Sequence, residues 1–298
     1  MTSPALPRNL VPLSLFLVLI LSACGVPGGL NLATATLPPT PTPTPTATPI
    51  PLAVSVNGEG ITVPEFEAEL GRYQQAQTAS GNTVSLETAK KTVSAEFVDV
   101  LLLAQGAAAK GYQVDDAALQ IRIDNLTAQV GGPEALTAWQ TSHGYTDATF
   151  RSDLRRQIAA AHMRDLVAAT VPPTAEQVHV KQILLYNADA AQQALGYLKA
   201  GWNFNDLAAQ YDPVTKGELG WFPRGYLSDP AIEAAAFALQ PGQYSDIIQT
   251  QAGYDILFVV ARDPARPLSP DALLTLQERA VQDWLTQRRN ESTILIAP

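Results

Sequence analysis

The side chains that most often bind metals or act as nucleophiles are scarce in this sequence and widely spaced. The chain of 298 residues has one cysteine, Cys24, and three histidines, His143, His162 and His179. One cysteine cannot form an internal disulfide, and the histidines lack the short spacings of a zinc site. The sequence contains no G-x-x-x-x-G-K-[ST] loop for ATP. We therefore expect no metal and no cofactor, so that any activity must draw on binding energy alone.

Cys24 lies in a setting that predicts its modification. Arg8 precedes an apolar run over residues 10–21, which is shorter than the roughly 20 residues that a membrane-spanning helix needs. Leu-Ser-Ala at residues 21–23 then leads directly to Cys24 and resembles the bacterial lipobox, in which the cysteine is acylated. Acyl chains contribute ~0.8 kcal/mol per buried CH₂ and would hold the protein on a membrane. We expect a lipoprotein signal peptide at residues 1–23 and lipidation of Cys24; a cleaved signal followed by an incidental thiol is the alternative.

Residues 24–51 predict an extended spacer. From residue 25 to residue 51 the chain has no charged side chain, and it ends in alternating threonine and proline. This alternation favours polyproline II and removes backbone donors, so the segment cannot form a packed core. A recognition motif for proline-binding partners is the alternative interpretation.

The composition of the remaining chain is that of a folded protein. The whole chain is 46% hydrophobic and 16% charged, which is enough apolar surface for one large or two ordinary domains. Its 28 acidic and 19 basic residues give a formal net charge of -9. This acidic balance argues against binding to nucleic acid.

Residues 52–172 predict a helical domain. The alternation over residues 53–61, with Asn57-Gly58 in its middle, predicts a β-hairpin. Apolar side chains at helical spacing follow, with capping residues before them and glycine after several of them. The expected helices cover residues 63–77, 85–110, 115–130, 133–142 and 146–170.

After Pro172-Pro173 the pattern changes to strands that alternate with helices. We expect strands at residues 178–185, 219–222 and 253–262, and helices at residues 188–200, 204–210 and 230–239. Together they predict a small domain, residues 173–265, built on an antiparallel sheet. A last helix at residues 269–289, within the segment 266–298, needs a partner surface, for which we expect the N-terminal helices. The fold class is therefore α+β: a helical domain completed by the C-terminal helix, with an inserted small domain of sheet flanked by helices.

Several blocks of sequence carry a resemblance to a known family. In order, they read HVKQILL, LKAGWNFNDLAAQY, GELGWFPRGYL and IEAAAFALQPGQYSDIIQTQAGYDI. These blocks resemble the parvulin-type foldases of the membrane-anchored PrsA and periplasmic SurA group. The helical part is similar to the chaperone domain of that group through VNG followed by FEAEL, and through TFRSDLRRQIAAAHMRDLV. The resemblance implies a SurA N-like chaperone domain at residues 52–172 and a parvulin-like, PpiC-type domain at residues 173–265.

The resemblance also implies a function. It is that of an extracytoplasmic peptidyl-prolyl cis-trans isomerase, anchored to the bacterial membrane through Cys24, that assists the folding of exported proteins. Its partners would be unfolded or extended polypeptides with X-Pro bonds, and oligomeric state stays open. Rotation about the imide bond has a barrier of ~18–20 kcal/mol and requires no covalent step. An apolar pocket that desolvates the imide, together with hydrogen bonds to its twisted form, lowers that barrier.

By resemblance, individual residues receive roles in this chemistry. Leu227, Ile232 and Phe237 would form the proline pocket, Asp212 would face the substrate carbonyl, and Thr250 would join the hydrogen-bonded network. Simple core packing of the three apolar side chains is the alternative for them. For Asp212 the alternative is a turn role before a proline.

Two positions depart from the family's usual pattern. Gln182 and Asp255 stand where members commonly have histidines, although Gln182 can still donate and accept hydrogen bonds. Asp255 near Asp212 would bring two carboxylates together and raise the pKa of one of them if both are buried. His179 cannot replace a histidine at residue 182, because a displacement of three residues along a strand reverses the face. We expect Trp221, in the GELGWF block, to be structural.

Three functions therefore stay open. The first is an isomerase, weakened by the loss of both histidines. The second is a non-catalytic chaperone or holdase whose parvulin domain only binds extended chain. The third is a surface lipoprotein that uses both domains as a scaffold for a specific partner.

Overall fold

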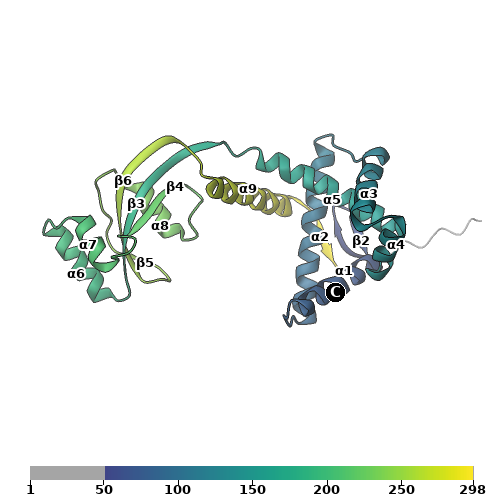
Figure 1. The fold of residues 1–298 in the computed structure, drawn as a ribbon, viewed down its shortest axis with the longest axis horizontal. Coiled ribbons are helices and arrows are strands. Elements are labelled where there is room, and N and C mark those ends of the chain that lie inside the picture. The colour runs from purple at the N-terminus through teal and green to yellow at the C-terminus, as the bar shows by residue number, and fades with distance from the viewer. Residues whose placement is uncertain (1–50, 298) are drawn as a thin grey trace, which may run out of the picture. The chain divides into compact units, whose positions relative to one another are not determined.

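A computed structural model describes residues 51–297 of the chain (Figure 1). The predicted signal peptide, the lipidation site at Cys24 and nearly all of the predicted spacer lie outside the described residues.

A helical part is formed by two separate stretches of the chain. Its elements are β1 (Leu52–Val56), β2 (Glu59–Thr62), α1 (Val63–Ala79), α2 (Leu86–Ala109), α3 (Asp116–Val130), α4 (Pro133–Ser142), α5 (Asp147–Ala168), α9 (Pro270–Glu291) and β7 (Ile294–Ile296). The predicted hairpin and all six predicted helices are present. Their first residues agree with the prediction to within one residue, because side-chain caps such as Ser85 and Asp115 mark them in the sequence.

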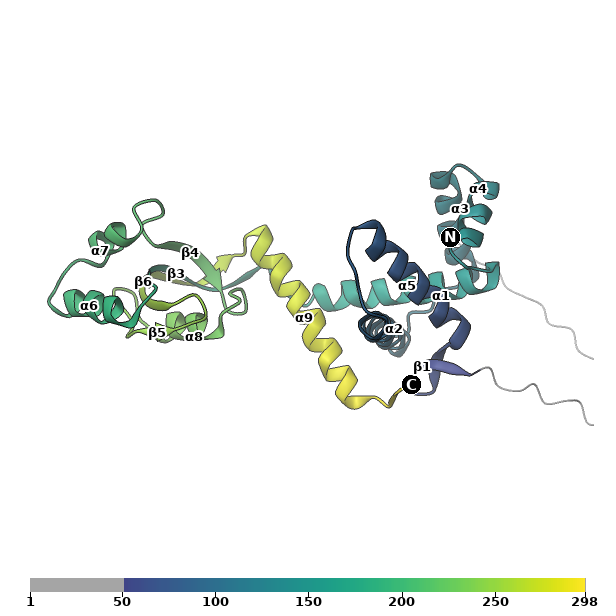
Figure 2. The same ribbon diagram turned by 90° about the horizontal axis from the view of Figure 1, so that it is seen from below.

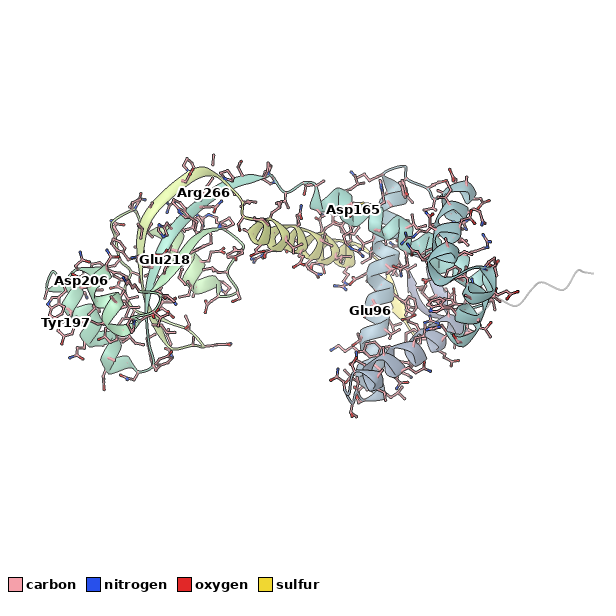
Figure 3. All side chains as sticks on the ribbon, viewed as in Figure 1. Glu96, Asp165, Tyr197, Asp206, Glu218 and Arg266 are labelled. Carbon is pink, nitrogen blue, oxygen red and sulfur yellow. The ribbon has the colours of Figure 1, made fainter. Side chains whose placement is uncertain are left out.

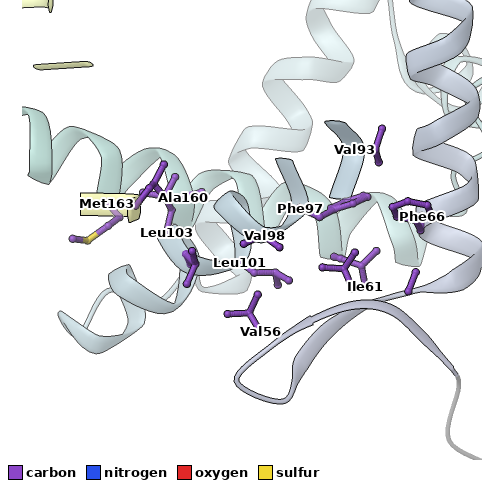
Figure 4. Packing of buried hydrophobic residues seen from close by; sticks show 14 of the residues in the cluster. Val56, Ile61, Phe66, Val93, Phe97, Val98, Leu101, Leu103, Ala160 and Met163 are labelled. Atoms are coloured by element: carbon purple, nitrogen blue, oxygen red, sulfur yellow. The ribbon is translucent and has the colours of Figure 1, made fainter. Parts of the chain in front are cut away.

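The core of the helical part is centred on α2 (Figure 4). Val93, Phe97 and Leu101 of α2 are buried against Phe66 of α1 and Val56 of β1. Within residues 51–297, α2 is the one helix long and apolar enough to cross a membrane, judged by length and composition alone. Half of its most apolar stretch is buried inside the protein, as expected for a helix at the centre of a hydrophobic core.

The C-terminal helix α9 packs on α2 and α5, as predicted (Figure 2). Val281 and Leu285 are buried there, and a Cβ at Gly106 of α2 would lie 2.7 Å from the ring of Trp284. Gly106 thus makes room for this indole ring. The chain then continues into β7, which pairs with β1 to give an antiparallel sheet of order β2-β1-β7. The sequence analysis missed β7 because three residues after a helix give no periodic signal.

The second part is built on another antiparallel sheet. Its elements are β3 (Thr174–Leu185), α6 (Ala188–Lys199), α7 (Phe204–Tyr211), β4 (Glu218–Pro223), α8 (Pro230–Ala238), β5 (Ile248–Gln249) and β6 (Tyr254–Pro267). The strand order is β4-β3-β6-β5. Helices α6 and α7 pack on one face of this sheet, and α8 packs on the other.

The strands β3 and β6 are longer than predicted. Their additional residues pair with each other, from Thr174 opposite Pro267 to Gln177 opposite Asp263. These segments are rich in polar and proline residues, so the sequence does not mark them as strands. The predicted fold class, a helical part completed by the C-terminal helix with an inserted domain of antiparallel sheet and helices, is confirmed. The domain boundaries given above stay predictions.

Candidate active site

One face of the second sheet gathers several of the predicted site residues. Gln182 of β3 lies opposite Leu257 of β6, and Leu184 lies opposite Asp255. Side chains that are directly opposite share a face, and alternate residues along a strand share it too. Gln182 and Asp255 therefore lie on the face that α8 covers, since Leu257 packs in the cluster beneath α8.

Asp255 is a buried carboxylate that is paired with a hydroxyl group. Its exposed fraction is 4%, and Thr250 Oγ1 donates a hydrogen bond to Asp255 Oδ2 at 3.0 Å. Burial raises the pKa of Asp255 above its usual value, against the lowering effect of the Thr250 hydrogen bond. The negative charge of Asp229 raises this pKa further, and no cation of the described residues acts on it. The structure thus brings together two of the predicted residues, Thr250 and Asp255.

Thr250 is positioned by a tight connection between β5 and β6. Its backbone N–H donates to the carbonyl oxygen of Gly253 at 2.8 Å. Gly253 has a φ of 151°, and a Cβ at this position would collide with the carbonyl oxygen of Leu185. Glycine is therefore required here for β6 to lie beside β3 with Asp255 in place.

The carboxylate that acts on Asp255 is not the expected one. The prediction paired Asp255 with Asp212, whereas the negative charge that raises the pKa of Asp255 is that of Asp229. Asp229 is the N-cap of α8, where its Oδ1 accepts a hydrogen bond from the backbone N–H of Ala231 at 2.8 Å. Sequence reasoning could have recognised Asp229 as a helix cap, but its influence on Asp255 depends on tertiary packing.

Asp212 is engaged by its own loop. Its Oδ1 accepts hydrogen bonds from the backbone N–H groups of Val214 at 3.1 Å and Thr215 at 3.0 Å. Its Oδ2 accepts from the Thr215 hydroxyl and from the backbone N–H of Gly217. These hydrogen bonds, that of the Thr215 hydroxyl above all, hold the pKa of Asp212 below its usual value. The geometry is that of a turn residue, and a role towards substrate stays a prediction.

A backbone hydrogen bond joins the loop of residues 212–217 to β3 at Gln182. The backbone N–H of Gln182 donates to the carbonyl oxygen of Gly217 at 2.7 Å. Gly217 has a φ of 73°, and a Cβ there would collide with the Gln182 carbonyl oxygen. Asp212 and Gln182 are thus linked through Gly217.

The three predicted pocket residues share one cluster but differ in accessibility. Ile232 and Phe237 of α8 are only 7% and 5% exposed, whereas Leu227 is partly buried at the edge of the cluster. The Phe237 ring lies between the guanidinium of Arg224, 4.0 Å from the ring centroid, and the ring of Phe222, at 6.1 Å. Ile232 and Phe237 therefore pack mainly as core residues, and Leu227 is the accessible member.

Two apolar residues that the sequence analysis did not assign pack at the same cluster. Leu219 of β4 and Ile248 of β5 are partly buried against it. Leu219 lies at an irregularity in the pairing of β3 with β4, between the pairs Val180–Gly220 and Lys181–Glu218. A local sequence pattern does not reveal such a shift in register, because the shift depends on the partner strand.

His179 and Trp221 form a separate group at the β3–β4 edge. The two residues are opposite each other and their rings stack with centroids 5.4 Å apart. His179 Nε2 contacts the carboxylate of Glu218, and the Arg266 guanidinium lies 4.3 Å from the Trp221 ring centroid; Glu218 and Arg266 are labelled in Figure 3. Trp221 is thus held in a stack, in agreement with the structural role expected for it.

Comparisons with known families agree with these two parts of the fold. Residues 14–164 match the family described as SurA-like N-terminal domain, and residues 171–273 match the family described as PPIC-type PPIASE domain. The two matches define a protein that joins a SurA-like part to a parvulin-type part. Since the first match covers about half of the chain, the chain belongs to the SurA-like N-terminal domain family. The resemblance found in the sequence is confirmed.

Named relatives are similar over part of their length. The foldase protein PrsA of Bacillus subtilis (strain 168) is 27% identical over 193 residues, which is 61% of this chain and 66% of that protein. The foldase protein PrsA of Geobacillus sp. (strain WCH70) is 29% identical over 173 residues, 54% of this chain and 61% of that protein. The chaperone SurA of Dechloromonas aromatica (strain RCB) is 27% identical over 188 residues, 51% of this chain and 42% of that protein. The chain thus spans less than two thirds of the length of these relatives.

Two solved structures are similar to this chain with TM-scores below 0.5. The crystal structure of the peptidylprolyl isomerase PrsA from Bacillus cereus has a TM-score of 0.45 and 21% identity, covering 81% of this chain and 86% of that chain. A SurA-like chaperone of Campylobacter jejuni has a TM-score of 0.32 and 15% identity, covering 83% of this chain and 98% of that chain.

Proposed function

We propose that this protein is an extracytoplasmic foldase whose PPIC-type domain accelerates the cis-trans isomerisation of X-Pro bonds in unfolded exported polypeptides. The observation that carries the proposal is the Thr250–Asp255 pair on the same sheet face as Gln182, bordered by apolar side chains beneath α8. This face lies inside the segment that matches the PPIC-type family. The foldase and chaperone names of the relatives support the same function.

In this proposal, the site acts by favouring the twisted imide over both planar forms. The substrate proline ring contacts Leu227 at the edge of the apolar cluster, which removes water from the imide. Twisting breaks the amide resonance and leaves a more basic imide nitrogen and a less polar, ketone-like carbonyl group. The side-chain amide of Gln182 provides a hydrogen-bond donor for the twisted form, and the Thr250–Asp255 pair on the same sheet face provides further polar groups. Each 1.4 kcal/mol gained in this way is worth about tenfold in rate.

A second candidate function, a holdase without catalysis, is favoured by a specific observation. Ile232 and Phe237 are almost fully buried, so that they offer little surface to a proline ring. The oxygens of Asp212 already accept hydrogen bonds from their own loop. A sheet face of this kind can bind extended chain and leave the isomerisation rate unchanged.

Exchange NMR on X-Pro peptides separates the two functions. The secreted part, residues 52–298, is expected to accelerate isomerisation, and Asp255→Ala to reduce the acceleration at least tenfold, about 1.4 kcal/mol of barrier. Asp246→Ala, an exposed aspartate in the same part, is the matched control and should retain the activity. A silent wild type, with activity gained in the double variant Gln182→His, Asp255→His, would establish the holdase. Silence of all variants would favour the holdase or the scaffold function.

Anchoring through Cys24 is the second part of the proposal. It is supported by the lipobox-like Leu-Ser-Ala-Cys sequence and by the uncharged spacer that follows. Metabolic labelling with an alkyne fatty acid is expected to mark the wild-type protein in the membrane fraction. Cys24→Ala should abolish both the label and the membrane association, and retention of the label would contradict the proposal.

A further inference from the structure

The sheet of the helical part has an open edge at β7. The sheet order is β2-β1-β7, so β7 has β1 on one side and no strand of the described residues on the other. Two backbone hydrogen bonds join this segment to the β1 side. The N–H of Asn57 donates to the carbonyl oxygen of Thr293 at 2.9 Å, and the N–H of Ala297 donates to the carbonyl oxygen of Ala53 at 2.8 Å. Since the direction of these groups alternates along a strand, the backbone N–H and C=O of Ile294 and Ile296 point away from β1.

An apolar groove runs beside this open edge. It has a volume of about 850 Å³. Its walls are formed by apolar residues of three elements, namely Val63, Phe66 and Leu70 of α1, Leu86 and Val98 of α2, and Ile294 and Ile296 of β7. Several of these residues, such as Phe66 and Val98, also belong to the buried core around α2. The groove is therefore a flank of the core that the described elements do not cover.

The rim of the groove is positively charged. Lys90 and Lys91 of α2 line the groove, are exposed, and form no salt bridge within residues 51–297. Arg289 is already engaged by Asp99 at 2.5 Å. Glu67 is the acidic residue that lines the groove. The two lysines are thus available to a partner with acidic side chains.

We infer that this groove binds an extended segment of an unfolded client protein, which adds a strand to the edge of β7. Its backbone pairs with the outward-facing groups of Ile294 and Ile296, and its alternate apolar side chains enter the groove. Acidic residues of the segment lie near Lys90 and Lys91. The inference rests on the proposed function for the existence of such clients, and adds a binding site in the helical part, separate from the parvulin-type part.

Charge distinguishes a client from the chain's own N-terminal segment as the occupant. Residues 25–51 contain no charged side chain, so they cannot pair with Lys90 and Lys91. A segment with acidic residues gains from both lysines, and exposed pairs of this kind are worth a few-fold in affinity each.

The test uses a proline-free probe, so that binding at a prolyl isomerase site does not contribute. The probe is a fluorescein-labelled peptide of twelve residues that alternates valine or phenylalanine with threonine and carries two aspartates. Its anisotropy is measured with the full chain in mild detergent. Lys90→Glu, Lys91→Glu is expected to weaken binding about tenfold, and added salt should weaken wild-type binding. Lys110→Glu, at the exposed C-terminal end of α2, is the matched control and should bind as the wild type does.

A second pair of variants tests the backbone contacts. Ile296→Pro removes an outward-facing N–H and keeps the bonds that Thr293 and Ala297 make with β1. Ile296→Pro is expected to lower the affinity for the probe at least fivefold, which corresponds to the loss of about one hydrogen bond. Leu295→Thr changes a neighbouring exposed side chain on the other face of β7 and should leave the affinity unchanged.

Three results would overturn the inference. The first is no saturable binding of the probe, and the second is equal binding of a probe with lysine in place of both aspartates. The third is a gain of more than tenfold on deletion of residues 25–51, which would make the chain's own segment the occupant. The X-Pro exchange assay on the same samples keeps the two proposals apart, since probe binding without isomerase activity supports the groove and contradicts the isomerase.

Discussion

Two carboxylates, the partly buried Glu65 of the helical part and the buried Asp255 of the sheet part, differ in their partners. In the helical part, Arg156 lies 3.2 Å from Glu65 and 3.7 Å from Asp153. Burial acts to raise the pKa of Glu65, but hydrogen bonds from Thr62 and the charge of Arg156 outweigh it, and the pKa lies below its usual value. In the sheet part, Asp255 accepts a hydrogen bond from the Thr250 hydroxyl and has no cationic partner among residues 51–297.

A carboxylate with a cationic partner mainly stabilises the fold, whereas one without such a partner is a candidate for a functional role. An ion pair that loses one partner leaves an uncompensated buried charge, so the arginine contacts of the helical part are strong constraints on its packing. A buried carboxylate without a cation has a raised pKa, so burial favours its protonated form more than in an exposed carboxylate. Such groups occur more often at functional sites than elsewhere. Asp255 is therefore the carboxylate on which the proposed chemistry depends most.

The largest expected effect is the loss of Arg156. Arg156→Ala leaves Glu65 and Asp153 without their guanidinium, and side chains of Arg156 and Glu65 are only 14% and 16% exposed. We expect the free energy of unfolding to fall by about 3 kcal/mol, measured by urea denaturation. The matched control is Arg151→Ala on the same helix, whose partner Asp147 is 68% exposed. Arg151→Ala should lower the free energy of unfolding by less than about 0.5 kcal/mol. Equal losses in the two variants would show that the partly buried Arg156 pair contributes no more than an exposed one.

An intermediate effect is expected from neutralising Asp255. Its folded pKa is raised, so its contribution to stability is most favourable below the usual aspartate pKa of about 3.9 and is lost as pH rises through the folded pKa. Asp255→Asn retains an oxygen that can accept from Thr250 and removes the charge. At neutral pH we expect a gain of ~1 kcal/mol, which corresponds to about 2–4 °C in Tm. The gain should disappear near pH 3.

Asp99 provides the contrast to this variant. Burial raises the pKa of Asp99 as well, but Arg289 acts against it at 2.5 Å. Asp99→Asn weakens that pair and should not stabilise the protein at neutral pH. If Asp99→Asn and Asp255→Asn stabilised the protein equally, the ion pair of Asp99 with Arg289 would not contribute to its stability.

Features set by neighbouring residues could be predicted from the sequence, whereas features set by residues distant in the chain could not. Helix starts depend on local caps such as Thr62 and Ser85, so they were predicted to within one residue. β7 and the Asp229–Asp255 interaction were missed, because strand pairing and burial are set by residues distant in the chain. Family resemblance singled out Gln182 and Asp255, whereas their position on one sheet face and the burial of Phe237 needed the packed structure.

The smallest expected effect concerns Asp212, an exposed carboxylate engaged by its own loop. Its pKa is lowered, first by the Thr215 hydroxyl, so its stabilising contribution is present above the usual aspartate pKa and is lost as pH falls through the folded pKa. Asp212→Ala should therefore lower Tm slightly at pH 7, and this loss should shrink as pH falls through the folded pKa of Asp212, with Asp246→Ala as the unaffected control.

The isomerase assay on the same Asp212→Ala protein decides between its two roles. If the carboxylate only shapes the loop, the variant should retain activity to within about threefold, less than 0.7 kcal/mol of barrier. This result follows because its oxygens accept from Val214, Thr215 and Gly217. A loss of a hundredfold or more, with the loop still folded, would instead place Asp212 beside Asp255 among the groups that act on the substrate. The contrast between carboxylates with and without a cationic partner would then not identify the site.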